Sequence, residues 1–409
     1  MKPEYIKKFE KLGLGLFVHF GLYSSFAIGE WCYKCSPDED LDKSTYFEEG
    51  LKRFKIEKDW AQKLISFAKG FGAKYITLTT RHHEGFSLYD TKGLSDFDVM
   101  HTPTKRDLIK EFVDECNKQG IIPFFYHTLL DWHHPDYDSN FPKYLEYLRD
   151  SVELLCTNYG KIGGLWFDGS WSRPTIEEWE FEKLYAVIRK HQPEAMIINN
   201  TGTGKRGEVC HDDIDSVTFE RGKPTAKITT SSGKEIAGEM CDGINDHWGY
   251  TENDINYKSV PHLIQSLIDC RRYNCNYLIN TGLMGNGYVC ELDKQLLNAL
   301  GIWIKSNQNF IYDVKGADVE ADNAYMMMDE EYYYAVVNDI QMFADPNVAR
   351  ESKAAPDVTI HCKKIISGEY LDNGEQIVMR EGTENTFVPK AFKWGHSLSS
   401  RVVRLKLEK

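Results

Sequence analysis

Eight short apolar segments that alternate with helix-like segments constrain the fold of this 409-residue chain more than any other feature. Most of them lack a strict apolar–polar alternation, which is typical of strands buried on both faces of a parallel sheet. They cover residues 13–20, 75–80, 121–130, 163–169, 195–200, 216–220, 236–241 and 275–282. Alternating strands and helices indicate an α/β fold, and eight strands over roughly 300 residues favour a (β/α)8 barrel over an open sheet.

Helical periodicity separates many of these segments. Helices are predicted at residues 58–72, 104–119, 142–158, 175–191, 257–273 and 291–305. Residues 221–235 are polar and look like a loop, so we expect one crossover helix to be missing and the barrel to be somewhat irregular.

The pattern changes after about Phe310. Short strand-like segments with polar loops follow, at residues 331–339, 357–362, 375–380 and 400–408. This pattern is typical of an all-β sandwich. We therefore predict a (β/α)8-like barrel domain over residues 1–306 and a C-terminal β-sandwich domain over residues 307–409.

Charge and hydropathy exclude several classes of partner. The chain has 62 acidic and 49 basic residues, a net charge of −13, and no dense basic run. It is therefore not expected to bind nucleic acid. No apolar run is long enough to span a membrane, and the charged N-terminal segment does not resemble a secretory signal. A neutral small-molecule substrate fits this composition better, and an assembly of identical chains is compatible with it.

Ten scattered cysteines indicate reduced thiols in a cytoplasmic protein. Cys32 and Cys35 form a C-x-x-C pair, but no second pair with matching spacing accompanies it. Such a pair alone is weak evidence for zinc. We expect no cofactor and no bound metal.

The predicted strand ends carry the residues that suit catalysis. In a (β/α)8 barrel the active site lies at the C-terminal ends of the strands. Histidine, carboxylate and tryptophan recur there: His19, His82, His83, Trp166, Asp168, Glu220, Glu239 and, beyond the seventh strand, Trp248. Two chemistries use such a set, namely glycoside hydrolysis with two carboxylates and metal-assisted hydrolysis with histidine and aspartate ligands.

The spacing of the histidines favours the first chemistry. His82 and His83 are adjacent, and neighbouring residues on a strand point to opposite faces. No H-x-H or H-E-x-x-H pattern occurs at a strand end. A hydrolase without metal is therefore favoured over a metal-dependent one.

Asp168 is the most informative single residue. A carboxylate is out of place in the apolar segment GGLWFDG unless it lies at the tip of the strand. Trp166, two residues earlier, points to the same face. The alternative is an ordinary Asp-Gly turn, which local sequence alone leaves open.

Several segments together resemble one enzyme family. They are LGLFVHFGLYS (14–24), GEW (29–31), AKYITLTTRHHEGFSLYDT (73–91), FFYHTLLDWHHP (124–135), GGLWFDGSW (163–171) and WGY (248–250). In this order, over most of residues 1–305, they resemble the α-L-fucosidases of glycoside hydrolase family 29. The resemblance implies a barrel followed by a β-sandwich, and an exo-acting, metal-free retaining hydrolysis of terminal α-L-fucosyl residues on glycans or glycosides.

The resemblance also implies roles for individual residues. Asp168 matches the family's nucleophile. The residues that match positions holding the fucose are His19, Glu30, Trp31, His82, His83 and Trp166, with Trp248 as a looser match.

The second carboxylate is harder to assign from sequence. Glu220 ends the strand-like segment SVTFE and resembles the family's acid/base segment, and Glu239 is the alternative. One departure is visible: Thr201 stands where many relatives have a sugar-binding arginine. A metal-dependent barrel hydrolase and a non-catalytic sugar-binding protein remain as alternative functions.

Overall fold

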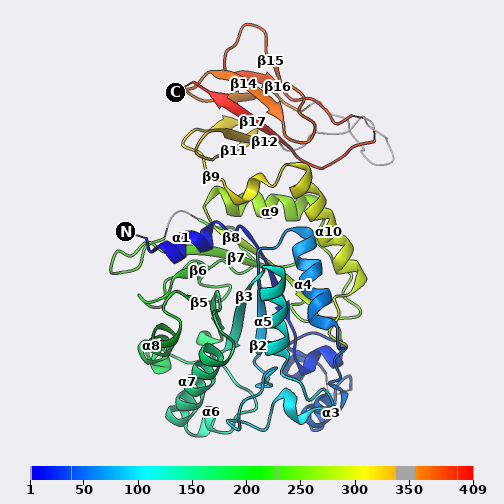
Figure 1. The fold of residues 1–409 in the computed structure, drawn as a ribbon, viewed down its shortest axis with the longest axis vertical. Coiled ribbons are helices and arrows are strands. Elements are labelled where there is room, and N and C mark those ends of the chain that lie inside the picture. The colour runs from blue at the N-terminus through cyan, green and yellow to red at the C-terminus, as the bar shows by residue number, and fades with distance from the viewer. Residues whose placement is uncertain (1, 38, 226–227, 338–354, 394, 409) are drawn as a thin grey trace. The chain divides into compact units, whose positions relative to one another are not determined.

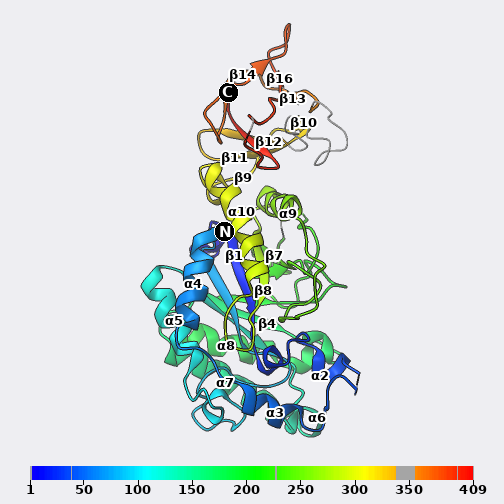
Figure 2. The same ribbon diagram turned by 90° about the vertical axis from the view of Figure 1, so that its right-hand side faces the viewer.

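Eight parallel strands form a closed barrel, β1 to β8 in chain order (Figure 1). The computed structural model describes residues 2–37, 39–225, 228–337, 355–393 and 395–408. The barrel strands are β1 (Leu14–His19), β2 (Tyr75–Arg81), β3 (Ile122–Thr128), β4 (Gly164–Asp168), β5 (Met196–Asn199), β6 (Ser216–Thr218), β7 (Ala237–Gly243) and β8 (Asn276–Gly282). β1 pairs with β8 and closes the ring, and Figure 2 shows these two strands side by side.

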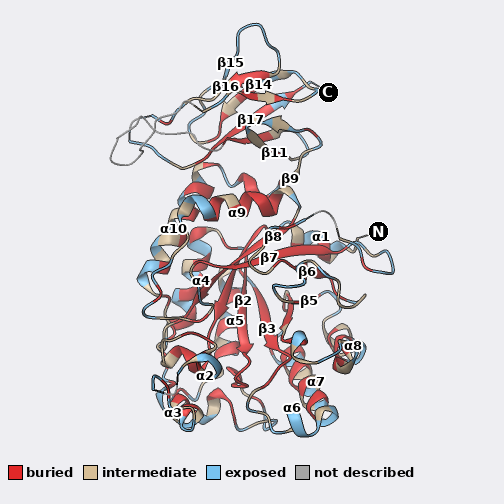
Figure 3. Cartoon of the chain, turned by 180° about the vertical axis from the view of Figure 1, so that it is seen from behind, coloured by how far each residue is buried: buried red, intermediate tan, exposed pale blue. Residues whose placement is uncertain are grey.

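The barrel strands are buried on both faces, as their apolar sequences predict (Figure 3). Large side chains fill the interior, among them Phe17, Tyr75, Phe124, Trp166 and Leu278. The interior is therefore a packed core, and a ligand can bind only at one of its ends.

Helices connect most of the barrel strands. In chain order they are α1 (Glu4–Glu10), α2 (Cys32–Cys35), α3 (Tyr46–Arg53), α4 (Trp60–Phe71), α5 (Leu108–Gln119), α6 (Asp136–Ser139), α7 (Phe141–Asn158), α8 (Phe181–His191), α9 (Val260–Arg272) and α10 (Glu291–Ser306). Local sequence sets their ends. In α5 the Asp107 carboxylate accepts a hydrogen bond from the Lys110 N–H at the start, and Gly120 adopts the left-handed conformation at the end.

Two neighbouring connections of the barrel have no crossover helix within their described residues. The sequence predicts one such connection, between β6 and β7, and the described part of this connection indeed contains no helix. Residues 200–215, between β5 and β6, also contain none. β6 is only three residues long and pairs with β5 through Ile198 and Ser216. The barrel is thus more irregular than the sequence predicts.

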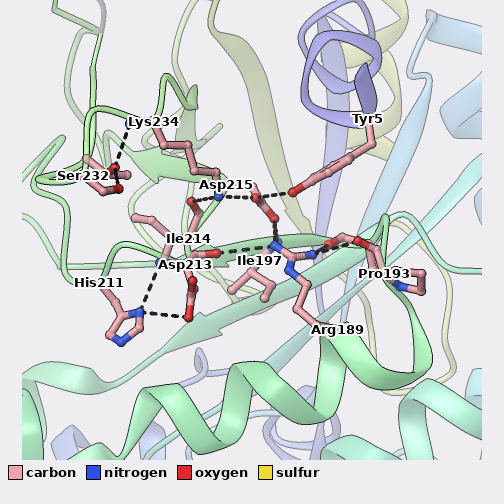
Figure 4. A network of polar contacts seen from close by, with 12 residues as sticks. Tyr5, Arg189, Pro193, Ile197, His211, Asp213, Ile214, Asp215, Ser232 and Lys234 are labelled. Atoms are coloured by element: carbon pink, nitrogen blue, oxygen red, sulfur yellow. Dashed lines mark hydrogen bonds and ion pairs between the residues drawn. The ribbon is translucent and has the colours of Figure 1, made fainter. Parts of the chain in front are cut away.

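A buried carboxylate stabilises this irregular side of the barrel (Figure 4). Asp215, directly before β6, is completely buried and accepts a hydrogen bond from the Ile197 N–H of β5 at 2.9 Å. Tyr5 donates to it over 2.8 Å and Lys234 over 2.9 Å, and Arg189 also forms an ion pair with it. Asp215 therefore joins α1, β5, α8 and the loop before β7.

Replacing Asp215 by alanine is expected to lower the free energy of unfolding by about 3–5 kcal/mol, because it leaves partly buried cations without their counter-charge. Urea denaturation followed by circular dichroism measures this. The matched control is Asp213→Ala, since Asp213 is exposed; its effect should stay within about 0.5 kcal/mol. Equal stability of the two variants would contradict this role of Asp215.

The C-terminal strands form two antiparallel sheets. One has the order β10 (Ala321–Asp322), β13 (Val358–Ile360), β16 (Thr386–Val388) and β15 (Val378–Met379). The other has the order β14 (Ile365–Tyr370), β17 (Arg401–Leu407), β12 (Tyr333–Val337), β11 (Ala324–Met328) and β9 (Lys315–Gly316). Buried side chains from both sheets, such as Ile360, Phe387 and Val403, form one core. The predicted fold class, a barrel followed by a β-sandwich, is confirmed.

The chain divides into two compact units. One comprises Met1–Lys258 and Asn276–Gln295, and the other comprises Ser259–Cys275 and Leu296–Lys409. The domain boundary that the sequence predicts between residues 306 and 307 stays a prediction. None of the helices within the described ranges is long and apolar enough to cross a membrane.

Candidate active site

A cavity of about 440 Å³ lies at the C-terminal ends of the barrel strands. This is the end at which barrels of this kind place their active sites. Eight of the residues predicted from sequence line it, namely His19, Trp31, His82, His83, Trp166, Asp168, Glu220 and Trp248. The structure therefore brings together residues that are more than 200 positions apart in the sequence.

Asp168 ends β4 and is held by several donors. Its Oδ1 accepts hydrogen bonds from the Gly169 N–H at 2.9 Å and from Asn200 Nδ2 at 3.1 Å. Its Oδ2 accepts one from the Tyr126 hydroxyl at 3.1 Å and lies 3.4 Å from His83 Nε2. Burial alone would raise the pKa of Asp168, but the contacts with His83, Asn200 and Gly169 lower it below its ordinary value. The group is therefore an anion at neutral pH.

Gly169 makes this arrangement possible. Its φ of +97° lies in the left-handed region, where glycine is favoured. A Cβ at this position would lie 2.8 Å from the Leu130 Cβ. The Asp-Gly pair is thus a tight turn whose glycine N–H points toward the carboxylate. An ordinary Asp-Gly turn and a functional aspartate at the strand end, the two interpretations of this dipeptide, are therefore compatible.

Glu220 lies just beyond β6, and its pKa is shifted in the opposite direction to that of Asp168. Burial and the negative charge of Asp168 raise the pKa of Glu220 above its ordinary value. Asn200 Nδ2 donates to its Oε2 over 2.9 Å and opposes this rise, as do the charges of Arg221 and Arg206. The two carboxyl groups in the cavity are therefore shifted in opposite directions, which is how paired acids and bases are set apart.

Glu239, the alternative to Glu220, lies outside the cavity lining. It is completely buried, and its two oxygens accept hydrogen bonds from the Tyr75 hydroxyl and, at 2.9 Å, from Trp166 Nε1. Burial raises the pKa of Glu239 to about 7, although both hydrogen bonds oppose this. Through its hydrogen bond with Nε1, Glu239 holds the indole ring of Trp166 in place.

His19 is a neutral imidazole with a defined tautomer. Burial lowers the pKa of His19 to about 3. Its Nδ1 lies 2.7 Å from Asn280 Oδ1, and Asn280 Nδ2 donates to the Trp248 carbonyl. Because Asn280 Oδ1 must then be an acceptor, the hydrogen of His19 is on Nδ1. Its Nε2 is therefore an acceptor.

The alternation argument for the adjacent histidines is wrong for His82 and His83. β2 ends at Arg81, after a register shift against β3, so both histidines lie beyond the strand. Their ring centroids are 4.3 Å apart, and both line the cavity. Even so, no group of three or more histidine, cysteine, aspartate or glutamate side chains that could hold a metal occurs among the described residues.

Aromatic rings surround the carboxylates. Trp248 stacks on His19 with ring centroids 5.4 Å apart, and Trp166 stacks on Tyr126 at 5.6 Å. Trp31 stacks on Trp171, which is 47% exposed and also lines the cavity. These rings offer flat apolar faces to a ligand, with Trp171 at the solvent side.

Glu30, which was predicted to hold the substrate, also lies outside the cavity lining. It is buried, and its Oε2 accepts hydrogen bonds from the N–H groups of Trp248 and Gly249, at 3.1 and 2.8 Å. In this structure its contacts hold the backbone of the Trp248 segment.

The loop after β5 forms part of the cavity lining. Thr201 and Lys205 both belong to this lining, and the Lys205 side chain is 68% exposed. Arg206 and Arg221 lie outside the lining. The Arg206 Nε donates to the Glu220 carbonyl, and Arg221 lies over the Trp248 ring at 4.7 Å.

Several residues of the lining were not predicted as site residues, among them Asn200, Trp171 and Tyr126. Tyr126 and Asn200 lie near the ends of predicted strands, so their position was a usable signal. Trp171 follows the Asp168 turn, and only the three-dimensional structure places it beside Trp31.

Comparisons with known proteins agree with this arrangement. The sequence profile of the family described as "Alpha-L-fucosidase" matches residues 2–309. The chain is 27% identical to the tissue alpha-L-fucosidase of Macaca fascicularis over 335 residues, which cover 75% of this chain and 69% of that protein.

Solved structures are similar over the full length. Alpha-L-fucosidase isoenzyme 1 from Paenibacillus thiaminolyticus superimposes with a TM-score of 0.82 and 28% identity, covering 99% of both chains. An alpha-L-fucosidase from Bacteroides thetaiotaomicron, described as a trapped covalent intermediate with 2-fluoro-fucosyl fluoride, shares the fold with a TM-score of 0.79 and 24% identity, covering 100% of this chain and 97% of that one. The family profile covers about three quarters of the sequence. The chain therefore belongs to the alpha-L-fucosidase family of glycoside hydrolases.

Proposed function

We propose that this enzyme is an exo-acting α-L-fucosidase that works by retaining double displacement, with Asp168 as nucleophile and Glu220 as acid/base. The observation that carries the proposal is the pair of carboxyl groups in one cavity, joined through Asn200 Nδ2 and shifted to opposite sides of their ordinary pKa values. One ionised and one protonated carboxyl is the state that the first step needs. The packed barrel interior closes the cavity at its base, which suits the terminal sugar of a fucosylated glycan or glycoside.

In the first step a carboxylate oxygen of Asp168 forms a bond to the anomeric carbon. The bond from that carbon to the leaving-group oxygen breaks, and its electron pair stays with this oxygen. Glu220 transfers its proton there, so the leaving group departs as a neutral alcohol. The products of this step are a covalent fucosyl ester on Asp168 and an ionised Glu220.

In the second step the ionised Glu220 takes a proton from water. The water oxygen bonds to the anomeric carbon while the ester bond to Asp168 breaks. Asp168 returns as a carboxylate and Glu220 as an acid. Two inversions give a product with the configuration of the substrate.

The remaining cavity residues suit a deoxy sugar. His19 Nε2 can accept a hydrogen bond from a sugar hydroxyl, and His82 and His83 lie beside it. The Trp248 and Trp166 rings offer apolar surface for the C–H face and methyl group of fucose. Glu30 contributes by holding the Trp248 backbone.

A relative supports the covalent route. The Bacteroides thetaiotaomicron enzyme with the same fold was captured as a covalent intermediate, according to its description. A nucleophilic carboxylate is the group that forms such an intermediate.

The test is a panel of fucosylated oligosaccharides of different linkages and an aryl α-L-fucoside, scored for free fucose. We expect release of fucose, and proton NMR during the first minutes should show the α anomer before mutarotation. Initial release of the β anomer would contradict the retaining mechanism. Binding without turnover would favour a sugar-binding protein, and activity lost on chelation and regained with a transition metal would favour a metal-dependent hydrolase.

We also propose that the enzyme acts in a reducing compartment such as the cytoplasm. Eight of the ten cysteines, namely Cys32, Cys35, Cys116, Cys156, Cys210, Cys241, Cys290 and Cys362, are free thiols, and four of these eight are buried. A protein of an oxidising compartment more often pairs its cysteines.

A further inference from the structure

The side-chain amide of Asn200 lies between the two carboxyl groups of the cavity. Asn200 follows β5, and its Nδ2 is 3.1 Å from Asp168 Oδ1 and 2.9 Å from Glu220 Oε2. An amide nitrogen carries two hydrogens, so one hydrogen is available for each carboxyl group. A single neutral group thus reaches both.

The orientation of this amide is fixed by its other end. Asn200 Oδ1 accepts hydrogen bonds from the Thr218 hydroxyl at 2.7 Å and from the Gly202 N–H at 3.2 Å. The Gly202 N–H can only donate, so the oxygen of the amide must lie on this side. The NH₂ group therefore faces the carboxyl groups, and Asn200 is itself 3% exposed.

This geometry distinguishes the oxygens of each carboxyl group. Asp168 Oδ1 accepts two hydrogen bonds, from Gly169 N–H at 2.9 Å and from Asn200 Nδ2 at 3.1 Å. Its Oδ2 accepts one, from the Tyr126 hydroxyl at 3.1 Å, and lies 3.4 Å from His83 Nε2. Glu220 Oε2 accepts from Asn200, and within the described part of the chain no donor reaches Oε1. A protonated carboxyl group accepts best through its carbonyl oxygen, so the proton of Glu220 belongs on Oε1.

We propose that Asn200 is a positioning residue that fixes the orientation of Asp168 and Glu220 relative to each other. It leaves Asp168 Oδ2 as the attacking oxygen and keeps the transferable proton on Glu220 Oε1. This inference rests on the proposed function, because it concerns how the same two carboxyl groups act. The proton moves from Oε1 to the leaving-group oxygen as Oδ2 bonds to the anomeric carbon. Asn200 exchanges no proton.

The test is the pH profile of kcat/KM for Asn200→Ala. The amide stabilises the ionised form of both carboxyl groups, so its loss raises both pKa values. The acidic limb of the profile, set by Asp168, and the basic limb, set by Glu220, should each move to higher pH by about 0.5–1 pH unit. The rate at the optimum should fall about 10- to 100-fold as the two groups lose their fixed orientation. The other charged or titratable groups around the pair stay in place in the variant, namely His19, His83, Tyr126, Arg206, Arg221 and Cys241.

A matched control separates positioning from loss of structure. Asn199, one residue earlier, is also buried but donates to the Tyr185 hydroxyl on the other side of the strand. Asn199→Ala should leave both limbs where they are, whatever its effect on stability. Unmoved limbs in Asn200→Ala would overturn the proposal.

A second variant keeps the test informative if Asn200→Ala does not fold. Thr218→Val preserves shape and removes the donor to Asn200 Oδ1, so the amide gains freedom and both limbs should move in the same direction by a smaller amount. Infrared titration of the carboxyl bands gives both pKa values without substrate. A wild type that releases no fucose would thus refute the proposed function, while unmoved carboxyl pKa values in the variants would refute the role of Asn200.

Discussion

Replacement of Asp168 by alanine is expected to abolish the release of 4-nitrophenol from an aryl α-L-fucoside, with kcat/KM lower by about 10³-fold or more. The reason is that no other carboxylate of the cavity lining can form the covalent bond, since Glu220 serves as the acid. Steady-state kinetics measure the loss, and circular dichroism shows whether the variant is folded. Activity close to that of the wild type would refute the assignment of the nucleophile.

Azide adds a stereochemical test to the same variant. The alanine side chain leaves space beside the anomeric carbon, and azide can attack there in place of the carboxylate. One displacement inverts the configuration, so the expected product is the β-fucosyl azide. Asp168→Asn is the matched variant that fills the space, and it should respond to azide much less.

The second large effect is expected for Glu220→Ala. Loss of the general acid should slow hydrolysis of a fucosyl disaccharide by about 10²–10⁴-fold, because the alcohol then leaves without a proton. A substrate with a good leaving group, such as a dinitrophenyl fucoside, should lose much less in its first step, and its covalent intermediate should accumulate. The contrast between the two substrates is the measurement, and equal losses on both would contradict the role of Glu220.

Azide distinguishes the two carboxylates by the anomer that it forms. In Glu220→Ala the covalent bond to Asp168 still forms, and azide then replaces water in the second step. Two inversions give the α-fucosyl azide, the opposite anomer to that from Asp168→Ala. Glu239→Gln is the control for the alternative acid, and it should yield no azide adduct because Glu239 does not line the cavity.

The strands of the barrel could be predicted because burial on both faces leaves a direct trace in the sequence. Each of the eight segments overlaps one barrel strand, with ends that differ by at most two residues. The C-terminal strands were harder. β9 and β10 are two residues long, and so short a segment has no periodicity to detect.

The site was predictable where a residue type is unusual for its surroundings. A carboxylate at the end of an apolar strand identifies Asp168, and the family motifs identify the histidines and tryptophans. The residue type of Asn200 gives no such signal. Its position near a predicted strand end places it close to the site, but its role depends on the meeting of β4, β5 and β6 in space. Glu30 shows the converse, since a matched motif places it near the site but its contacts are with the Trp248 backbone.

The two connections without crossover helices have a consequence for how new substrate ranges could be made. The connection after β5 carries Thr201–Lys205 along one rim of the cavity. Neither this connection nor the described part of the connection after β6 contains a helix that would have to be repacked if its length changes. Doubling such a loop costs only about 0.6 kcal/mol of closure entropy. Loop exchange on this side, with Asn200, Asp215 and Glu220 kept, is therefore the simplest way to reshape acceptor binding for oligosaccharide synthesis.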